Sequence, residues 1–181
     1  MINKTQLRLI AKSKFIIDKS FKDQVIANNV FAFVKYREAS KVFIYLSLDD
    51  EVSTDSIIEK SFSEGKRVFV PVVKGDKMCA VEIYPTTQMI LGVFGIREPQ
   101  TYSFEPQSPI IDIAIIPMVA GDKQLNRLGQ GGGYYDKWLA ENYIFKLGIC
   151  YDERVFDSIL SFDHDIKMDT IITDKTIYKN E

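Results

Sequence analysis

Short apolar segments that alternate with helical patterns restrict the folds open to this chain. The segments are residues 41–48, 67–73, 110–116, 145–151 and 170–173, with a further strand expected over residues 78–84. Runs this short, rich in β-branched and aromatic residues, predict buried strands. Strands that are apolar on both faces and separated by helices are typical of a mainly parallel sheet with helices on both faces. We therefore predict an α/β fold.

Helical spacing precedes and separates these strands. Asn3 is a plausible N-cap for a first helix, and a second amphipathic helix fits residues 22–37, which together make an N-terminal helical pair. Further helices are expected over residues 54–64 and 133–142. Pro71 implies that its strand ends there or lies at an edge. Residues 85–109 hold four of the six prolines and predict a long surface excursion.

Size and composition favour one domain covering residues 1–181. The 181 residues are 46% hydrophobic, enough for one sizeable core. The formal net charge of −2 offers no general attraction for nucleic acid or an anionic membrane. The basic N-terminus runs straight into the second helical pattern, so we interpret it as part of the fold and not as a transit peptide.

The cysteines and the apolar runs predict an intracellular protein. Cys79 and Cys150 are isolated, and the chain has a single histidine, so the usual zinc ligand sets are absent from the sequence. No apolar run reaches the roughly 18 residues that span a bilayer, and no signal-peptide pattern opens the chain. We expect a cytoplasmic monomer that binds neither nucleic acid nor membrane.

A glycine-rich segment is the strongest candidate for chemistry. Residues 129–133 contain four of the ten glycines, between a buried strand and a helix. Glycine allows the backbone to approach a ligand closely, and a helix N-terminus attracts anions. Arg127 adds a forked cation suited to phosphate. The segment is neither a Walker A loop nor a GxGxxG fingerprint, since Tyr134 stands at the third glycine position. An ordinary flexible turn is the alternative, but the arginine and the helix favour phosphate binding.

Five fragments of the sequence resemble one known family. Arg-Leu-Gly-x-Gly-Gly-Gly-Tyr-Tyr-Asp, residues 127–136, closely resembles the signature of the 5-formyltetrahydrofolate cyclo-ligase family. In order along the chain, the other fragments are Lys4-x-x-Leu-Arg8, Tyr45-Leu-Ser-x-x-x-Glu51, Gly95-Ile-Arg-Glu-Pro99 and His164-Asp-Ile-x-Met-Asp169. The chain also departs from the family, which often has Phe-Asp where Gly121-Asp122 stands and Gly-Asn where Leu125-Asn126 stands. The variable position within the glycine run is Gln130.

The resemblance implies an activity and a set of site residues. Family members use ATP to convert 5-formyltetrahydrofolate to 5,10-methenyltetrahydrofolate, with release of ADP and phosphate, through an activated formyl phosphate. Two aspartates, Asp136 and Asp169, would bind Mg²⁺, and Leu46, Glu51, Tyr134 and Tyr135 would bind the folate. The residues implied for ATP are Lys4, Arg8, Arg127, Leu128, Gly129, Gln130, Gly131, Gly132, Gly133, Tyr134 and Tyr135.

Each of these residues also has a simpler interpretation. Lys4 and Arg8 share a helix face and repel each other mildly, which an anion would relieve, but they can also be solvated cations. Glu51 can be a turn acid, Asp136 can stabilise its helix N-terminus, and Asp169 can be a turn residue. The alternative function is a nucleotide-binding regulatory or RNA-associated paralogue without ligase turnover. Such a protein would not need Glu51.

Overall fold

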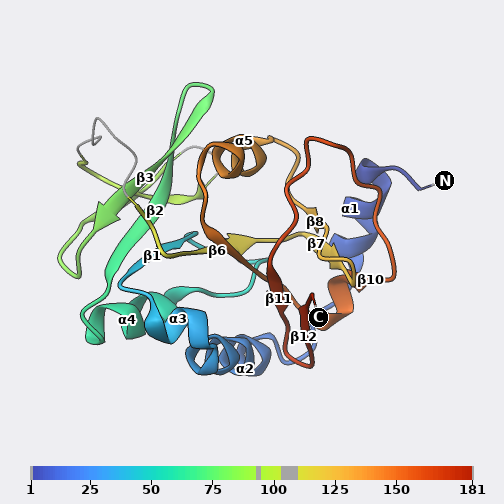
Figure 1. Cartoon of the computed structure of the whole chain (residues 1–181), viewed down its shortest axis with the longest axis horizontal. Helices are drawn as coiled ribbons and strands as arrows, with labels where there is room; N and C mark the ends of the chain where they lie inside the picture. Colours follow the sequence, from blue (N-terminus) through green and yellow to red (C-terminus); the bar gives the residue numbers. More distant parts are fainter. Residues whose placement is uncertain (1, 93–94, 103–109, 181) are drawn as a thin grey trace.

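The computed structural model describes residues 2–92, 95–102 and 110–180. Its largest feature is a seven-stranded sheet with the order β12-β11-β9-β6-β1-β2-β3 (Figure 1). In chain order these strands are β1 (Lys41–Ile44), β2 (Arg67–Lys74), β3 (Lys77–Ile83), β6 (Ile113–Pro117), β9 (Phe145–Ile149), β11 (Thr170–Ile172) and β12 (Ile177–Lys179). The strands expected from the sequence are therefore present.

The central strands run parallel. β1 pairs in parallel with β2 and β6, and β9 pairs in parallel with β6 and β11. The antiparallel pairings lie at the two edges, between β2 and β3 and between β11 and β12. Because the central strands point the same way, their carboxyl ends meet along one edge, where ligands bind in such sheets. The prediction of a mainly parallel sheet is confirmed.

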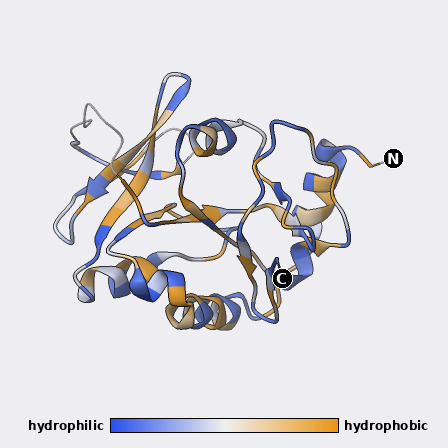
Figure 2. Cartoon of the chain, viewed as in Figure 1, coloured by the Kyte–Doolittle hydropathy of each residue, from blue (hydrophilic) through white to orange (hydrophobic). Residues whose placement is uncertain are grey.

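Helices cover both faces of this sheet, as expected. On one face lie α2 (Lys19–Ala32), α3 (Val34–Glu38) and α4 (Asp55–Ser63), whose buried residues pack with Ile44 and Ile115. On the other face lies α5 (Tyr134–Glu141), where the Trp138 ring stacks on Phe43 at 4.3 Å between centroids. The strands between these layers are largely apolar, whereas hydrophilic residues gather on the outer surface (Figure 2). Alternate residues of each strand thus enter two different cores.

A small second sheet carries the first helix. It has the order β10-β7-β8 and is formed by β7 (Ala120–Asp122), β8 (Arg127–Leu128) and β10 (Val155–Phe156). Helix α1 (Lys4–Ser13) packs its buried Leu7 and Ala11 against this sheet. Asn3 caps α1 in a reciprocal capping box with Gln6, at 2.9 and 3.1 Å. The two N-terminal helices therefore dock on different sheets.

Two expected elements differ in their limits. The helix expected over residues 22–37 is interrupted at Phe33, whose extended backbone (φ −71°, ψ 124°) separates α2 from α3. The Phe33 side chain instead packs beside Phe145, at 5.8 Å between ring centroids. Pairing of β1 ends at Ile44, before the predicted end of that strand. Pro71 follows the part of β2 that pairs with β1, so it lies where β2 pairs with β3 alone.

The proline-rich excursion contains a two-stranded sheet that the sequence did not predict. Strands β4 (Met89–Leu91) and β5 (Arg97–Pro99) pair antiparallel. The rest of the excursion lies partly at residues 93–94 and 103–109, outside the described residues. None of the helices in the described part of the chain is long and apolar enough to cross a membrane.

Candidate nucleotide and folate site

The glycine-rich loop lies against the guanidinium group of Arg127. Arg127 is 7% exposed, donates from Nη2 to Asp136 Oδ2 at 2.8 Å and approaches the Pro117 carbonyl at 3.4 Å. A Cβ atom at position 129 would come within 2.7 Å of Arg127 Nη1, so only glycine fits without displacing that group. Because Pro117 ends β6, the loop lies at the carboxyl edge of the main sheet. This is the edge expected to carry the chemistry.

Helix α1 contacts the same loop through Arg8. Arg8 Nε donates to the Gly129 carbonyl at 2.8 Å, across 121 residues of sequence. Gly131 adopts a left-handed backbone (φ 107°), and a Cβ there would lie 3.3 Å from Arg8 Cζ. Two guanidinium groups, from α1 and β8, therefore flank the glycine loop.

Lys4 does not reach the loop directly. It forms an ion pair with Asp165, and its Nζ lies 4.6 Å from the Phe162 ring centroid. The amide of the next residue, Ile166, donates to Asp136 Oδ1 at 3.2 Å. Asp165 and Ile166 therefore link Lys4 on α1 to Asp136 on α5. Asp136 in turn pairs with Arg127.

The start of α5 adds backbone donors to this site. Gly133 is the N-cap residue with φ 70°, and no side chain within the described structure caps the helix. The first amides of a helix have no intrahelical acceptor and carry partial positive charge. Together with Arg8 and Arg127 they form an arrangement suited to phosphate groups.

Glu51 faces the loop from the other side. It is 8% exposed, and its Oε2 accepts from the Leu48 amide at 3.0 Å. Its Oε1 accepts from Gln130 Nε2 at 3.3 Å, across 79 residues. Burial raises the pKa of Glu51 above its usual range, and the Leu48 and Gln130 hydrogen bonds partly oppose this. The structure thus brings together the residues predicted for ATP and for folate.

The other predicted folate residues have unequal access. Tyr135 lies between Arg127, at 5.5 Å, and Phe43, at 6.4 Å, measured to its ring centroid. Burial, and then the charge of Glu51, raises the pKa of the Tyr135 hydroxyl, which stays protonated. The Tyr134 hydroxyl is 3.5 Å from the Gly75 carbonyl, in the β2–β3 turn. Leu46 is 5% exposed and belongs to the main core.

The two predicted metal ligands contact different parts of the chain. The Asp136 carboxylate accepts from Arg127, which contacts Pro117, the partner of Ile149 at the end of β9. Asp169 instead accepts from the backbone and side chain of Lys146, near the beginning of β9, at 2.7 and 2.8 Å. Among the described residues no three His, Cys, Asp or Glu converge as a metal site. Asp136 therefore lies beside the phosphate-type loop and Asp169 beside the start of β9, and a magnesium site that uses both carboxylates stays a prediction.

The departures from the family signature have a structural explanation. Leu125 has φ 67°, a left-handed backbone that costs a leucine about 1–2 kcal/mol and that glycine adopts readily. The Leu125 side chain is 1% exposed, and burying a leucine contributes about 1.5–3 kcal/mol, which offsets the strain. Asp122 is fully buried and fixes this turn by accepting from the Gln124 and Asn126 amides, both at 2.9 Å. The turn therefore keeps its conformation without the glycine.

Several residues of the site were not identified from the sequence. Asp122 accepts hydrogen bonds from the turn before the loop, and Tyr151 and Asp23 contact the segment that carries Glu51. Their partners lie up to 128 residues away, so no local pattern identifies them. The exception is Asp122, which stands two and four residues before its backbone partners, the spacing of a side chain that caps a turn.

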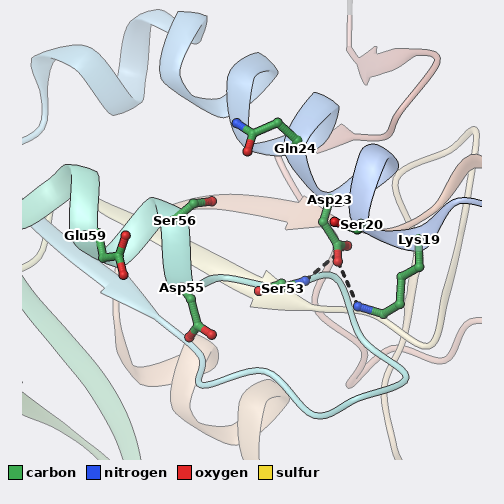
Figure 3. A pocket seen from close by; sticks show the side chains of 8 residues that line it. All are labelled: Lys19, Ser20, Asp23, Gln24, Ser53, Asp55, Ser56 and Glu59. Carbon is green, nitrogen blue, oxygen red and sulfur yellow. Dashed lines mark hydrogen bonds and ion pairs between the residues drawn. The ribbon is translucent and has the colours of Figure 1, made fainter.

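Two hollows lie outside the glycine loop. One, of about 550 Å³, lies between α2 and α4 (Figure 3) and is lined by Lys19, Ser20, Asp23, Gln24, Ser53, Asp55, Ser56 and Glu59. The other, of about 350 Å³, lies on α1 and is lined by Ile2, Gln6, Leu9 and Ile10. The first hollow reaches the Asp23 carboxylate, which accepts from the amide of Ser53, two residues after Glu51.

Comparison with known proteins decides the family. Residues 4–174 match the 5-formyltetrahydrofolate cyclo-ligase family. The chain belongs to this family. It is 27% identical to the 5-formyltetrahydrofolate cyclo-ligase of Haemophilus influenzae, covering 93% of this chain and 94% of that protein. It is 29% identical to the probable 5-formyltetrahydrofolate cyclo-ligase of Schizosaccharomyces pombe, covering 99% and 98%.

Solved structures of cyclo-ligase relatives share the fold. The NMR structure of Aquifex aeolicus 5,10-methenyltetrahydrofolate synthetase superposes with a TM-score of 0.84, at 26% identity, over 97% of this chain and 92% of that one. A 5,10-methenyltetrahydrofolate synthetase from Mycoplasma pneumoniae gives a TM-score of 0.72 at 27% identity, over 95% and 96%. The family and the fold predicted from the sequence are therefore confirmed.

Proposed function

We propose that this chain is a 5-formyltetrahydrofolate cyclo-ligase, which uses ATP to make 5,10-methenyltetrahydrofolate, ADP and phosphate. The observation that carries the proposal is the contact between Gln130 of the glycine loop and the buried carboxylate of Glu51. It puts a phosphate-type loop and a buried carboxylate in one site, in a member of the cyclo-ligase family. A nucleotide-binding module without turnover is not favoured, because it has no need of Glu51.

The glycine loop is the proposed binding site for the ATP phosphates. Arg8 and Arg127 supply fixed positive charge on either side of it, and the first amides of α5 supply donors. Arg127 Nε is buried and has no hydrogen-bond partner within the described residues, so it retains a donor. Lys4 would act at longer range, through its ion pair with Asp165.

Glu51 is the proposed acceptor for the pterin ring of the folate. A pterin presents an amino group and ring N–H groups, and a carboxylate can accept two such bonds in a fixed geometry. Gln130 engages one of its oxygens, so the folate would take over that acceptor or share it. Tyr135 lies close enough to the same carboxylate to feel its charge, Tyr134 is the adjacent ring at the start of α5, and Leu46 supports the segment from the core.

The reaction needs positioning more than a covalent nucleophile. The formyl oxygen on N5 attacks the γ-phosphorus of ATP, and the bond to the β–γ bridging oxygen breaks to release ADP. N10 then attacks the activated carbon and gives up its proton to solvent, and phosphate leaves with the former formyl oxygen to complete the methenyl bridge. Phosphoryl transfer of this kind depends on alignment and on neutralising charge. Arg8, Arg127 and the α5 amides would provide the charge, and Glu51 would orient the ring.

Mg²⁺ is expected to bind together with ATP. Magnesium in such sites is held by phosphate oxygens, waters and one or two carboxylates, and it supplies charge neutralisation for the phosphates. Asp136 would be one protein carboxylate, since it lies beside the loop and is 21% exposed. Asp169, whose carboxylate pairs with Lys146 in the ligand-free protein, is the second carboxylate proposed from the family resemblance.

The enzyme is proposed to act as a cytoplasmic monomer, one domain over residues 1–181, on two small molecules and without nucleic acid or membrane. The two halves of the site come from the same chain, so no second copy is needed to complete it. The net charge of −2 and the reduced state of Cys79 and Cys150 are consistent with this setting.

The proposed function is tested by incubating the protein with 5-formyltetrahydrofolate, with and without MgATP. We expect the near-UV absorption band of the methenyl product to grow only when both nucleotide and divalent cation are present. Growth of the band without ATP, or in excess chelator, would contradict the proposed chemistry. Nucleotide binding without any product would favour the regulatory module.

A further inference from the structure

The segment that carries Glu51 is held at consecutive backbone positions. The Tyr151 oxygen lies 3.1 Å from the Glu51 carbonyl, a secondary acceptor for the single hydroxyl hydrogen that also serves Asp23, and the Tyr45 hydroxyl donates to the Val52 carbonyl at 2.8 Å. The Ser53 amide donates to Asp23 Oδ1 at 3.2 Å. Three neighbouring residues are therefore contacted by side chains from the segment after β9, from the residue after β1 and from α2.

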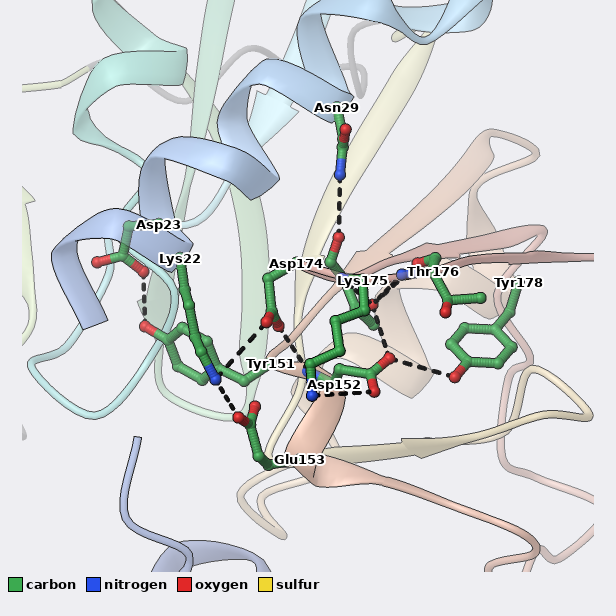
Figure 4. A network of polar contacts seen from close by, with 11 residues as sticks. Lys22, Asp23, Asn29, Tyr151, Asp152, Glu153, Asp174, Lys175, Thr176 and Tyr178 are labelled. Carbon is green, nitrogen blue, oxygen red and sulfur yellow. Dashed lines mark hydrogen bonds and ion pairs between the residues drawn. The ribbon is translucent and has the colours of Figure 1, made fainter. Parts of the chain in front are cut away.

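Asp23 joins two of these contacts. Its Oδ1 accepts from the Tyr151 hydroxyl at 2.6 Å, a contact drawn in Figure 4. The same oxygen accepts from Ser53, and Oδ2 accepts from Lys19 Nζ at 2.8 Å, as seen in Figure 3. A single carboxylate on α2 therefore bonds both to Tyr151, two residues beyond β9, and to the segment after Glu51.

The Asp23–Tyr151 contact is largely withdrawn from solvent. Tyr151 is 1% exposed, and the Asp23 side chain is 14% exposed. A hydrogen bond to a carboxylate is stronger than one between neutral groups, which agrees with the shorter of the two distances at Tyr151. Burial first, and then Asp23, raises the pKa of the Tyr151 hydroxyl, so this group remains a donor.

We propose that Asp23 and Tyr151 are positioning residues for the folate half of the site, because together they hold the backbone that aims the Glu51 carboxylate. This inference rests on the proposed function, in which Glu51 accepts from the pterin ring. Neither residue touches that carboxylate, whose partners are Leu48 and Gln130. Asp23 and Tyr151 instead hold the backbone on which the direction of the Glu51 carboxylate depends. A displacement of a catalytic group by about 1 Å is enough to lower the rate of a site strongly.

The phosphate half of the site serves as an internal control, because ATP affinity can be compared with folate affinity in the same variant. Arg8, Arg127 and the start of α5 share no hydrogen bond with Asp23 or Tyr151 among the contacts of the described residues. A positioning role therefore predicts that loss of the Asp23–Tyr151 contact weakens folate binding and leaves ATP binding unchanged. A general effect on the fold would weaken both.

The test uses Tyr151→Phe, which removes the hydroxyl and keeps the ring. Affinity for 5-formyltetrahydrofolate and for a non-hydrolysable ATP analogue is measured by titration. We expect the variant to lose about fivefold to tenfold in folate affinity, the effect of one hydrogen bond, and to change by less than about twofold for the analogue. In a Glu51→Gln background the same change should cost less than about twofold, because there is no longer a carboxylate to aim.

Two further variants complete the experiment. Asp23→Asn should act in the same direction as Tyr151→Phe, and it serves as the second test if the tyrosine variant does not fold. Tyr36→Phe is the matched control, since Tyr36 is also 1% exposed and its hydroxyl bonds Ser61 Oγ at 2.9 Å, away from the site. It should leave both affinities unchanged.

The outcomes separate this inference from the proposed function. If the wild type binds folate and Tyr151→Phe binds it equally well, the positioning role is overturned while the proposed function stands. Equal losses of folate and nucleotide affinity, or an equal loss in the Glu51→Gln background, would also overturn it. A wild type that binds no folate would overturn the proposed function, and the positioning role with it.

Discussion

Replacing Glu51 by glutamine should separate stability from folate binding. In the protein without ligands, the new side-chain oxygen can keep the 3.0 Å bond to the Leu48 amide. Its nitrogen then faces Gln130 Nε2, but Gln130 is exposed and can turn its amide to present the oxygen. The substitution therefore keeps the hydrogen bonds of residue 51 with Leu48 and Gln130 in the ligand-free protein. It changes only the acceptor atom that is available to the folate.

The direction of the stability change follows from the pKa of Glu51. Burial raises that pKa above its value in the unfolded chain, so ionising Glu51 at neutral pH costs the folded state free energy. Glutamine avoids this cost, and we expect Glu51→Gln to be as stable as the wild type at pH 7, or more stable. In the complex one acceptor becomes a donor facing a pterin donor. Losing a hydrogen bond to a charged group costs about 1.5–3 kcal/mol, which corresponds to at least about tenfold in folate affinity.

The assay pairs thermal melting with titration of 5-formyltetrahydrofolate and of an ATP analogue. Glu38→Gln is a charge-matched control, because Glu38 is exposed at the end of α3. It should match the wild type in every measurement. Equal folate affinity in Glu51→Gln and wild type would refute the reasoning. A parallel loss of melting temperature and nucleotide affinity would show that Glu51 is a structural turn acid.

Three other perturbations test the remaining parts of the site. Folate affinity should be full at neutral pH and fall as the pH drops through a midpoint above 4.5, because protonation removes the acceptor; a titration series from pH 7 downward should show no such step in Glu51→Gln. Arg8→Lys keeps the positive charge but loses the planar guanidinium that bonds the glycine loop, so ATP affinity measured by calorimetry should fall by roughly 1 kcal/mol or more. An unchanged ATP affinity would show that Arg8 is not part of the phosphate site. Asp136→Asn should raise the Mg²⁺ concentration for half-maximal activity more than it changes folate binding, whereas normal Mg²⁺ dependence with a lower melting temperature would assign Asp136 to its ion pair with Arg127 alone.

Local sequence was sufficient for the elements that frame the site. The apolar runs of β1, β6 and β9 are buried on both faces, so their pattern predicts strands and a parallel sheet without knowledge of their partners. The glycines beside Arg127 predicted a close approach of the backbone to a ligand, which stays a prediction; in the structure Gly129 leaves room for the Arg127 guanidinium. The strands of the small sheet, β7, β8 and β10, have only two or three residues each and carry no detectable period.

The side-chain pairs of the site were less predictable. Spacing on α1 placed Lys4 and Arg8 on one face, but it did not reveal that Arg8 contacts the loop while Lys4 pairs with Asp165. Asp136 and Asp169 were predicted to share a metal because both follow family motifs. The protein partners of the two carboxylates, Arg127 for Asp136 and Lys146 for Asp169, depend on tertiary packing, so no local pattern identifies them.

The sequence by itself determined the layer architecture, the glycine loop and the family, because each follows from periodicity or from residues adjacent in the chain. The tertiary structure alone decided that Gln130 meets Glu51 and that Asp23 and Tyr151 hold the segment around it. Hydrophobic patterning specifies which side of an element is buried, since burial depends on area removed from water. Hydrogen bonds depend on distance and direction between particular atoms, so those partners are fixed only once the elements have packed.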